Sequence, residues 1–143
     1  MVDRDLILAK AGSVKRRLDR IIEKRGNDLT LFLKDLDRQE IILFNLQMAI
    51  QECIDMASHI ISEEGWGVPG STNEMFYLLE ENGYLERDLT ERMVRSVGFR
   101  NLMVHGYVKI EMEEVYHIAQ KDIHDLYKYL SAVFSKLGLK AKA

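Results

Sequence analysis

The chain has 143 residues, of which 47% are hydrophobic and 30% are charged, and its formal net charge is −3. This balance excludes a disordered chain and is typical of a soluble globular protein, long enough for one domain with a sizeable core. The negative net charge excludes a global positive field, so any contact with nucleic acid has to come from a local basic cleft. The lone cysteine, Cys53, excludes an internal disulfide.

Two further features bear on localisation. The beginning of the chain does not resemble a signal peptide, and apolar runs such as Ile41 to Phe44 are far too short to span a bilayer. We therefore expect a cytoplasmic protein that makes no contact with a membrane.

The first predicted helix covers residues 3–25, and Gly26 follows it as a stop signal. Apolar residues recur in it at roughly helical spacing, namely Leu6, Ala9, Val14, Leu18, Ile21 and Ile22. Much of its remaining surface is basic, with Arg16, Arg17, Arg20, Lys24 and Arg25. We interpret these basic residues as a solvated face rather than a phosphate-binding one. The next segment, LTLFLKDLD (residues 29–37), fits a helical turn or a packed loop, and its pattern does not distinguish them.

The strongest predicted helix covers residues 37–64. Asp37 is placed to cap it, and Glu40, three residues on, gives a variant of the capping box. Its apolar stripe is broad enough to face two neighbouring helices and comprises Ile42, Leu46, Ala49, Ile50, Cys53, Ala57, Ile60 and Ile61. His59 lies four residues after Asp55, which favours a hydrogen-bonded residue at the edge over a catalytic partner.

The rest of the chain predicts three more helices. GWGVPGSTN is rich in glycine and proline and indicates a tight connector. We expect its Trp66 to pack the connector, with an exposed tryptophan that anchors a partner as the alternative. Gly106 is placed to end the fourth helix. The three predicted helices cover residues 73–81, 89–105 and 111–136.

No segment shows the alternation of a β-strand over a useful length. The predicted fold is therefore all-α, a single-domain up-and-down helical bundle of about five helices. We expect the domain to cover residues 1–137, followed by a flexible tail over residues 138–143.

The segment RNLMVHGYV, residues 100–108, gathers the polar residues with the greatest chemical potential. Asn101 and His105 are four residues apart and share a helix face, Arg100 is adjacent, and Gly106 lets Tyr107 fold back beside His105. Arginine holds phosphate oxygens and histidine moves protons near neutral pH, so this set suits phosphodiester chemistry. An ordinary helix end remains the alternative, because the helix dipole favours cations near a C-terminus.

Metal chemistry is not indicated. No carboxylate pair or His/Cys cluster has the spacing of metal ligands, so we expect neither a metal nor a cofactor. His117 and His124 lie seven residues apart on one face of the last predicted helix, where a solvated face is favoured over a metal site.

Three stretches carry a family resemblance. GFRNLMVHGYV resembles the R-x4-H-x-Y signature of HEPN-domain proteins of the HepT type. NLQMAIQECIDMASHII resembles the second helix of that family, and VPGSTNEMFYLLEENGYL resembles its central connector and short helix. The resemblance covers most of the chain, and it favours a catalytic motif over an ordinary helix end.

The resemblance implies a HEPN-like bundle that forms a homodimer and lines a cleft with both copies of the motif. It implies the toxin component of a type VII-like toxin–antitoxin system, a metal-independent endoribonuclease with RNA as its substrate. Arg100 and His105 would be the catalytic pair, and Asn101 a supporting residue. Tyr107 would be the residue to which an MntA-like minimal nucleotidyltransferase antitoxin transfers AMP, silencing the toxin. The alternative is a non-catalytic HEPN docking or substrate-binding subunit of a nucleotidyltransferase complex, which the net acidity favours.

Overall fold

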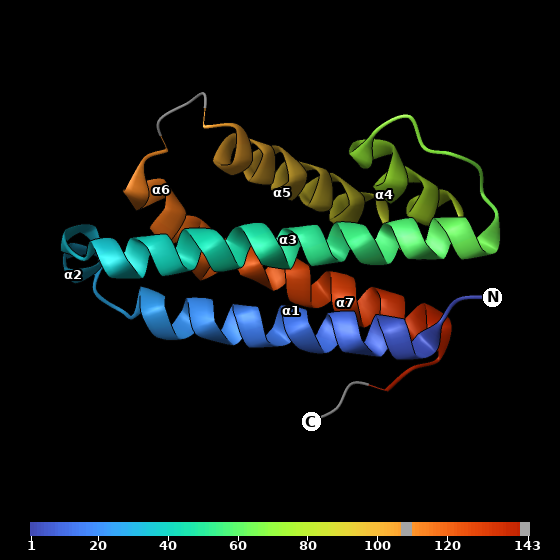
Figure 1. Ribbon diagram of the computed structural model, residues 1–143, viewed down its shortest axis with the longest axis horizontal. Helices are drawn as coiled ribbons and strands as arrows, with labels where there is room; N and C mark the ends of the chain where they lie inside the picture. The colour runs from blue at the N-terminus through green and yellow to red at the C-terminus, as the bar shows by residue number, and fades with distance from the viewer. Residues whose placement is uncertain (107–109, 141–143) are drawn as a thin grey trace.

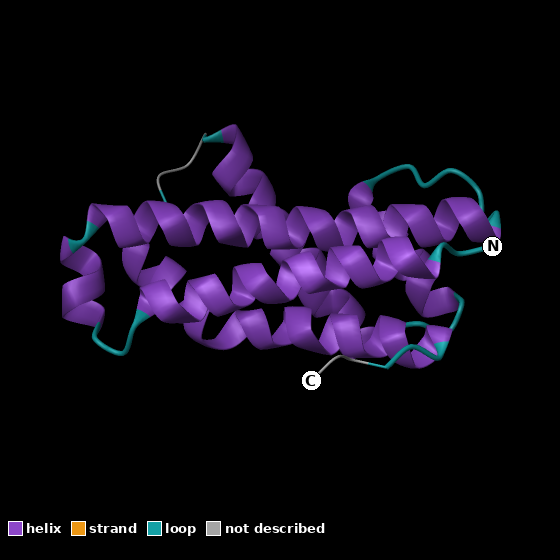
Figure 2. Cartoon of the chain, turned by 60° about the horizontal axis from the view of Figure 1, so that its bottom comes forward, coloured by secondary structure: helices purple, strands orange, loops and turns teal. Residues whose placement is uncertain are grey.

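The structure is a computed structural model that describes residues 1–106 and 110–140. Those residues contain helices and connecting loops and no β-strand (Figure 2). The elements are α1 (Arg4–Arg25), α2 (Leu29–Lys34), α3 (Leu36–Glu64), α4 (Thr72–Glu81), α5 (Arg87–His105), α6 (Met112–His117), the π-helical turn η1 (Ile118–Asp122) and α7 (Ile123–Leu137). The prediction of an all-α fold is confirmed.

The bundle is built around α3. Helix α1 lies alongside α3 on one side, and α4 and α5 pack on the other side of α3 (Figure 1). Helix α7 contacts α1, α3 and α5. The colour gradient in Figure 1 shows that α1 and α3 run in opposite directions and that α5 reverses the direction of α3. This is the predicted up-and-down arrangement.

The core follows the apolar stripe of α3. All eight residues predicted for that stripe are buried, including Cys53. On α1 the buried face is Ile7, Ala11, Val14, Leu18 and Ile21. Leu6, Ala9 and Ile22, which we predicted to be part of the stripe, are exposed, so this part of the prediction is wrong.

The segment of residues 29–37, for which the sequence allowed a helical turn or a packed loop, contains the short helix α2. Asp28 caps α2 by accepting a hydrogen bond from the backbone N–H of Leu31, 3.2 Å away. Phe32 of α2 is buried, and its ring centroid lies 5.4 Å from that of Tyr116. This contact explains why a six-residue helix, too short to be stable alone, forms here.

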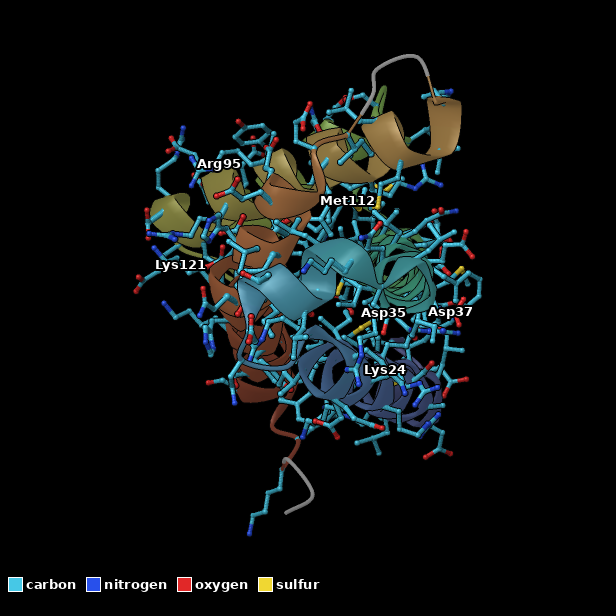
Figure 3. All side chains as sticks on the ribbon, turned by 90° about the vertical axis from the view of Figure 1, so that its left-hand side faces the viewer. Lys24, Asp35, Asp37, Arg95, Met112 and Lys121 are labelled. Carbon is cyan, nitrogen blue, oxygen red and sulfur yellow. The ribbon has the colours of Figure 1, made fainter. Side chains whose placement is uncertain are left out.

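The prediction that Asp37 caps α3 is wrong. Helix α2 ends at Lys34, and the next residue, Asp35, has extended backbone and is the cap. Its carboxylate accepts hydrogen bonds from the backbone N–H and the Nε of Arg38, both at 3.1 Å. The cap therefore lies two residues earlier than Asp37, and Glu40 is not the third residue of the helix. Figure 3 labels both aspartates at this end of the molecule.

The last predicted helix is interrupted. A π-helical turn, η1, separates α6 from α7, so the segment is not one continuous α-helix. The α-helical spacing that placed His117 and His124 on one face does not hold across this turn. Both histidines are exposed, as predicted, and Nε2 of His117 lies 4.0 Å from a carboxylate oxygen of Glu113.

Helix α7 ends at Leu137, where Gly138 adopts a left-handed conformation. The flexible tail over residues 138–143 stays a prediction, since residues 141–143 lie outside the described residues. Leu139 donates its backbone N–H to the Phe134 carbonyl at 2.9 Å and packs against the core. Within the described chain, no helix is both long enough and apolar enough to cross a membrane.

Candidate active site

The predicted motif lies in the last turns of α5. The helix ends at His105, and Gly106 adopts the left-handed conformation with φ of 64° while its N–H bonds the Leu102 carbonyl at 3.1 Å. A positive φ is accessible to glycine at no steric cost, which is why the helix ends here. His105 is exposed, whereas Arg100 and Asn101 are half-buried. Tyr107 lies outside the described residues, so its place beside His105 stays a prediction.

The side chain of Arg100 reaches from α5 to the neighbouring helix α3. Its Nη1 donates a hydrogen bond to Oδ1 of Asn101 at 3.1 Å, and its Nη2 donates a very short one to Oε1 of Gln51 on α3. Its Nε is buried and has no partner among the described residues. The structure thus joins two of the predicted site residues, Arg100 and Asn101, directly, and it links them to a helix that the motif does not include.

The electrostatic setting of Arg100 differs from that of the arginines that form ion pairs. Five arginines in the described chain lie within ion-pair distance of a carboxylate, namely Arg17, Arg20, Arg38, Arg87 and Arg92. Both partners of Arg100 are neutral amides. Its guanidinium is therefore oriented without being neutralised, and its remaining Nη hydrogens suit a bidentate contact with a phosphate.

The surroundings of the motif include exposed apolar side chains. Leu102 and Val104 of α5 are 42% and 43% exposed, next to Arg100 and His105 in the chain. Exposed apolar residues beside a charged site are a common feature of surfaces that a partner covers.

A separate cavity of about 370 Å³ lies between α5 and η1–α7. Its polar lining includes Arg92, Arg95, Asp122 and Asp125. Figure 3 shows Arg95 of α5 on the same side of the molecule as Lys121 of η1. Burial raises the pKa of Asp122, and the charge of Asp125 raises it further, while Arg95 acts in the opposite direction. Arg100, Asn101 and His105 do not line this cavity.

The remaining histidine and the tryptophan have structural roles. The Nε2 of His59 accepts a hydrogen bond from the backbone N–H of Asp3 at 3.0 Å, which confirms a hydrogen-bonded edge residue, although the partner is not Asp55. The ring of Trp66 packs edge-on against Tyr84 with centroids 5.6 Å apart, as predicted for the connector. In the described chain no group of three or more His, Cys, Asp or Glu residues is arranged to hold a metal ion.

The basic face of α1 is only partly solvated. Arg16 and Arg20 are exposed, as predicted. Arg17 instead pairs with Glu52 on α3, and Nη1 of Arg25 donates to the Ala119 carbonyl at 3.1 Å. The prediction fails for these two because α1 packs against its neighbours on more than its apolar side.

Sequence analysis missed one residue of this site, Gln51. Its partner Arg100 is 49 positions away, so no local spacing connects them. The available signal was a polar residue on the flank of a helix whose other positions are mostly apolar, with Asp55 one turn further on.

Comparison with known proteins identifies the family. Residues 14–133 match the family described as ribonuclease HepT-like. An mRNA nuclease HepT of Shewanella oneidensis is 31% identical over 129 residues, which cover 90% of this chain and 96% of the relative. A tRNA nuclease HepT of Aphanizomenon flos-aquae is 29% identical over 103 residues, covering 72% of this chain and 70% of the relative.

Solved structures agree with this result. Tri-AMPylated HEPN toxin of Shewanella oneidensis in complex with MNT antitoxin superposes with a TM-score of 0.85 at 30% identity, covering 92% of this chain and 98% of that one. A crystal structure of a toxin–antitoxin with AMP-PNP gives the same TM-score, identity and coverage. The chain therefore belongs to the ribonuclease HepT-like family.

Proposed function

We propose that Arg100 and His105 form the catalytic pair of an endoribonuclease, the toxin of a toxin–antitoxin pair. The observation that carries this proposal is the guanidinium of Arg100, which is held by two neutral amides and has no carboxylate partner among the described residues. It lies five residues before the exposed His105 at the end of the same helix, in a chain of the ribonuclease HepT-like family. The substrate is RNA as a chemical class, since relatives are named for mRNA and for tRNA.

The mechanism follows from these two side chains. The imidazole of His105 accepts the proton of a ribose 2′-hydroxyl, and the 2′-oxygen attacks the adjacent phosphorus. Negative charge grows on the non-bridging oxygens of the pentacoordinate phosphate, where Arg100 stabilises it. The bond from phosphorus to the 5′-oxygen then breaks, and an imidazolium returns a proton to that oxygen. The products are a 2′,3′-cyclic phosphate and a 5′-hydroxyl, and no step needs a metal ion.

A homodimer is the functional unit of this proposal. One copy supplies one His105, whereas a two-fold axis beside the motif supplies a second imidazole, so that one acts as base and the other as acid. The exposed Val104, next to His105 in the chain, supports this arrangement, because a second copy would cover it. Solution mass measurement at micromolar concentration tests it, and a monomer alone would contradict the shared cleft.

Silencing is assigned to Tyr107. A structural relative is a tri-AMPylated HEPN toxin in complex with MNT antitoxin. We propose that an MntA-like nucleotidyltransferase transfers AMP from ATP to the Tyr107 hydroxyl, with release of pyrophosphate. Bulky anionic groups there would occupy Arg100 and repel RNA. Cleavage of RNA by the purified protein in the presence of a chelator, with Arg100→Ala and His105→Ala beside it, tests the activity that all of this depends on.

A further inference from the structure

A chain of hydrogen bonds leads from α1 to Arg100. Nζ of Lys10 donates to Oδ2 of Asp55 at 3.3 Å, and Nε2 of Gln51 donates to Oδ1 of the same carboxylate at 2.9 Å. Oε1 of Gln51 then accepts from Nη2 of Arg100. Three helices, α1, α3 and α5, are thus connected to the guanidinium of the motif.

The direction of the chain determines which end of the Gln51 amide faces Arg100. An ionised carboxylate only accepts hydrogen bonds, so Asp55 must receive the NH2 group of Gln51. The amide oxygen is then turned toward Arg100, which only donates. The opposite orientation would place two donors against each other and a carbonyl against a carboxylate. Asp55, itself paired with Lys10, therefore selects the one orientation in which Gln51 can hold Arg100.

From this geometry we propose that Gln51 is a positioning residue for Arg100, and that Asp55 acts on Arg100 through Gln51. The inference rests on the proposed function, in which Arg100 contacts the phosphate. Gln51 aims the guanidinium and leaves its charge intact, which a carboxylate at the same place would not do. The charge of Asp55 is balanced by Lys10 and lies one side chain away from Arg100.

Loss of the Gln51 side chain should displace the guanidinium of Arg100 and leave the fold intact. Gln51, Asp55 and Lys10 are half-buried and lie outside the hydrophobic core. Nε of Arg100 has no partner among the described residues, so only Gln51 and the adjacent Asn101 hold the guanidinium in place. A misplaced catalytic group lowers the rate of the chemical step, and displacements of about 1 Å cost on the order of 100-fold.

The test uses RNA cleavage by the purified protein, with kcat and KM measured separately. Gln51→Met removes the amide at nearly constant side-chain length, and it should lower kcat by roughly 10- to 100-fold while KM changes little. The matched control is Gln47→Met, one turn earlier on α3 at another half-buried glutamine, which should cleave like the parent protein. Asp55→Ala should lower kcat in the same direction by a smaller factor.

A double variant distinguishes positioning from a general structural effect. If Asp55 acts through Gln51, adding Asp55→Ala to Gln51→Met should lower kcat no further, whereas independent effects would multiply. The inference is overturned if Gln51→Met has the same kcat as Gln47→Met. It is also overturned if the losses of kcat caused by Gln51→Met and Asp55→Ala multiply in the double variant. Arg100→Ala separates this outcome from failure of the proposed function. If Arg100→Ala is inactive and Gln51→Met cleaves as fast as the parent protein, the inference alone is rejected. If Arg100→Ala cleaves as fast as the parent protein, the proposed function itself is rejected.

Discussion

Arg17 of α1 and Glu52 of α3 form an ion pair at the interface between the two longest helices, with Nε 3.3 Å from Oε1. The hydroxyl of Ser13 donates to the same oxygen at 2.7 Å. Glu52 is only 8% exposed, and its other oxygen is buried without a partner in the described chain. The carboxylate therefore depends on Arg17 for the compensation of its charge.

Arg17→Met should lower the free energy of unfolding by about 2–4 kcal/mol, because it leaves a buried carboxylate unpaired. The double variant Arg17→Met with Glu52→Met should recover part of this loss, since no buried charge then remains. Chemical denaturation of the two variants and the parent measures both effects. Equal stability of Arg17→Met and the parent would show that the pair does not stabilise the α1–α3 interface.

The cap of α3 offers a comparison between two nearby aspartates. Asp35 accepts a hydrogen bond from the backbone N–H of Arg38, whereas Asp37 lies within the first turn and no hydrogen bond of its side chain is described. Asp35→Ala should cost about 1 kcal/mol of stability, the usual effect of losing a helix cap. Asp37→Ala should cost less than about half of that. Thermal or chemical denaturation decides between them, and the reverse order would place the cap at Asp37 after all.

Two buried acidic groups predict the behaviour of the protein at high pH. Burial raises the pKa of the Cys53 thiol far above its ordinary value of 9.0, and the charges of Glu52 and Asp55 add to this effect. Burial also raises the pKa of Tyr129 well above 10.0, and the hydroxyl of Tyr129 donates to the Cys53 carbonyl at 2.9 Å. Both groups thus stay protonated in the folded chain at a pH where the unfolded chain ionises them.

Above about pH 9 the unfolded state therefore binds fewer protons than the folded state, and stability falls as pH rises. Each group should contribute a slope that approaches about 1.4 kcal/mol per pH unit once its unfolded form is ionised. Below the ordinary pKa values of a thiol and a phenol, the contribution of these two groups to the free energy of unfolding is fully present. Denaturation between about pH 8 and about pH 11 should give a shallower decline for Cys53→Ala than for the parent. Parallel declines would mean that the thiol does not carry this effect.

Tyr107 should be the target of the antitoxin. Co-expression with an MntA-like nucleotidyltransferase should add one or more AMP masses to the tryptic peptide that contains Tyr107. Tyr107→Phe should remain folded and toxic but lose protection by the partner, because the attacking hydroxyl is gone. Mass spectrometry and growth assays check the two parts. Protection that persists in the Phe variant, or an adduct on another residue, would indicate silencing by binding alone.

The fold could be predicted because helical periodicity survives in the packed chain. The stripe of α3 from Ile42 to Ile61 is buried as its spacing requires, and Gly26 and Gly106 end their helices as expected. The features of the fold that the sequence did not predict depend on contacts between helices. Phe32 packs on a residue 84 positions later, so the pattern of its own segment did not reveal a helix. The π-helical turn η1 follows from no local signal in the apolar spacing.

In the candidate site, too, the sequence predicts some residues, and only the tertiary structure reveals another. Arg100, Asn101 and His105 follow from their spacing on one helix and from the family signature. The partner that orients Arg100 comes from α3, and only the packing of α5 on α3 brings Gln51 within reach. Sequence spacing describes neighbours within one helix, whereas residues that meet across helices require the tertiary structure.

Arg100 and His105 are proposed to cleave RNA by promoting attack of a ribose 2′-oxygen. The most direct measurement uses the purified protein in a chelator, with an RNA oligonucleotide and its analogue carrying a single 2′-deoxy ribose at the mapped cleavage position. The parent protein should leave a 2′,3′-cyclic phosphate on the RNA and should not cleave the deoxy position. Arg100→Ala and His105→Ala should each lose at least about 100-fold in rate, while His124→Ala, at an exposed histidine on α7, should cleave like the parent. Cleavage at the deoxy position, or full activity of either motif variant, would rule out this mechanism.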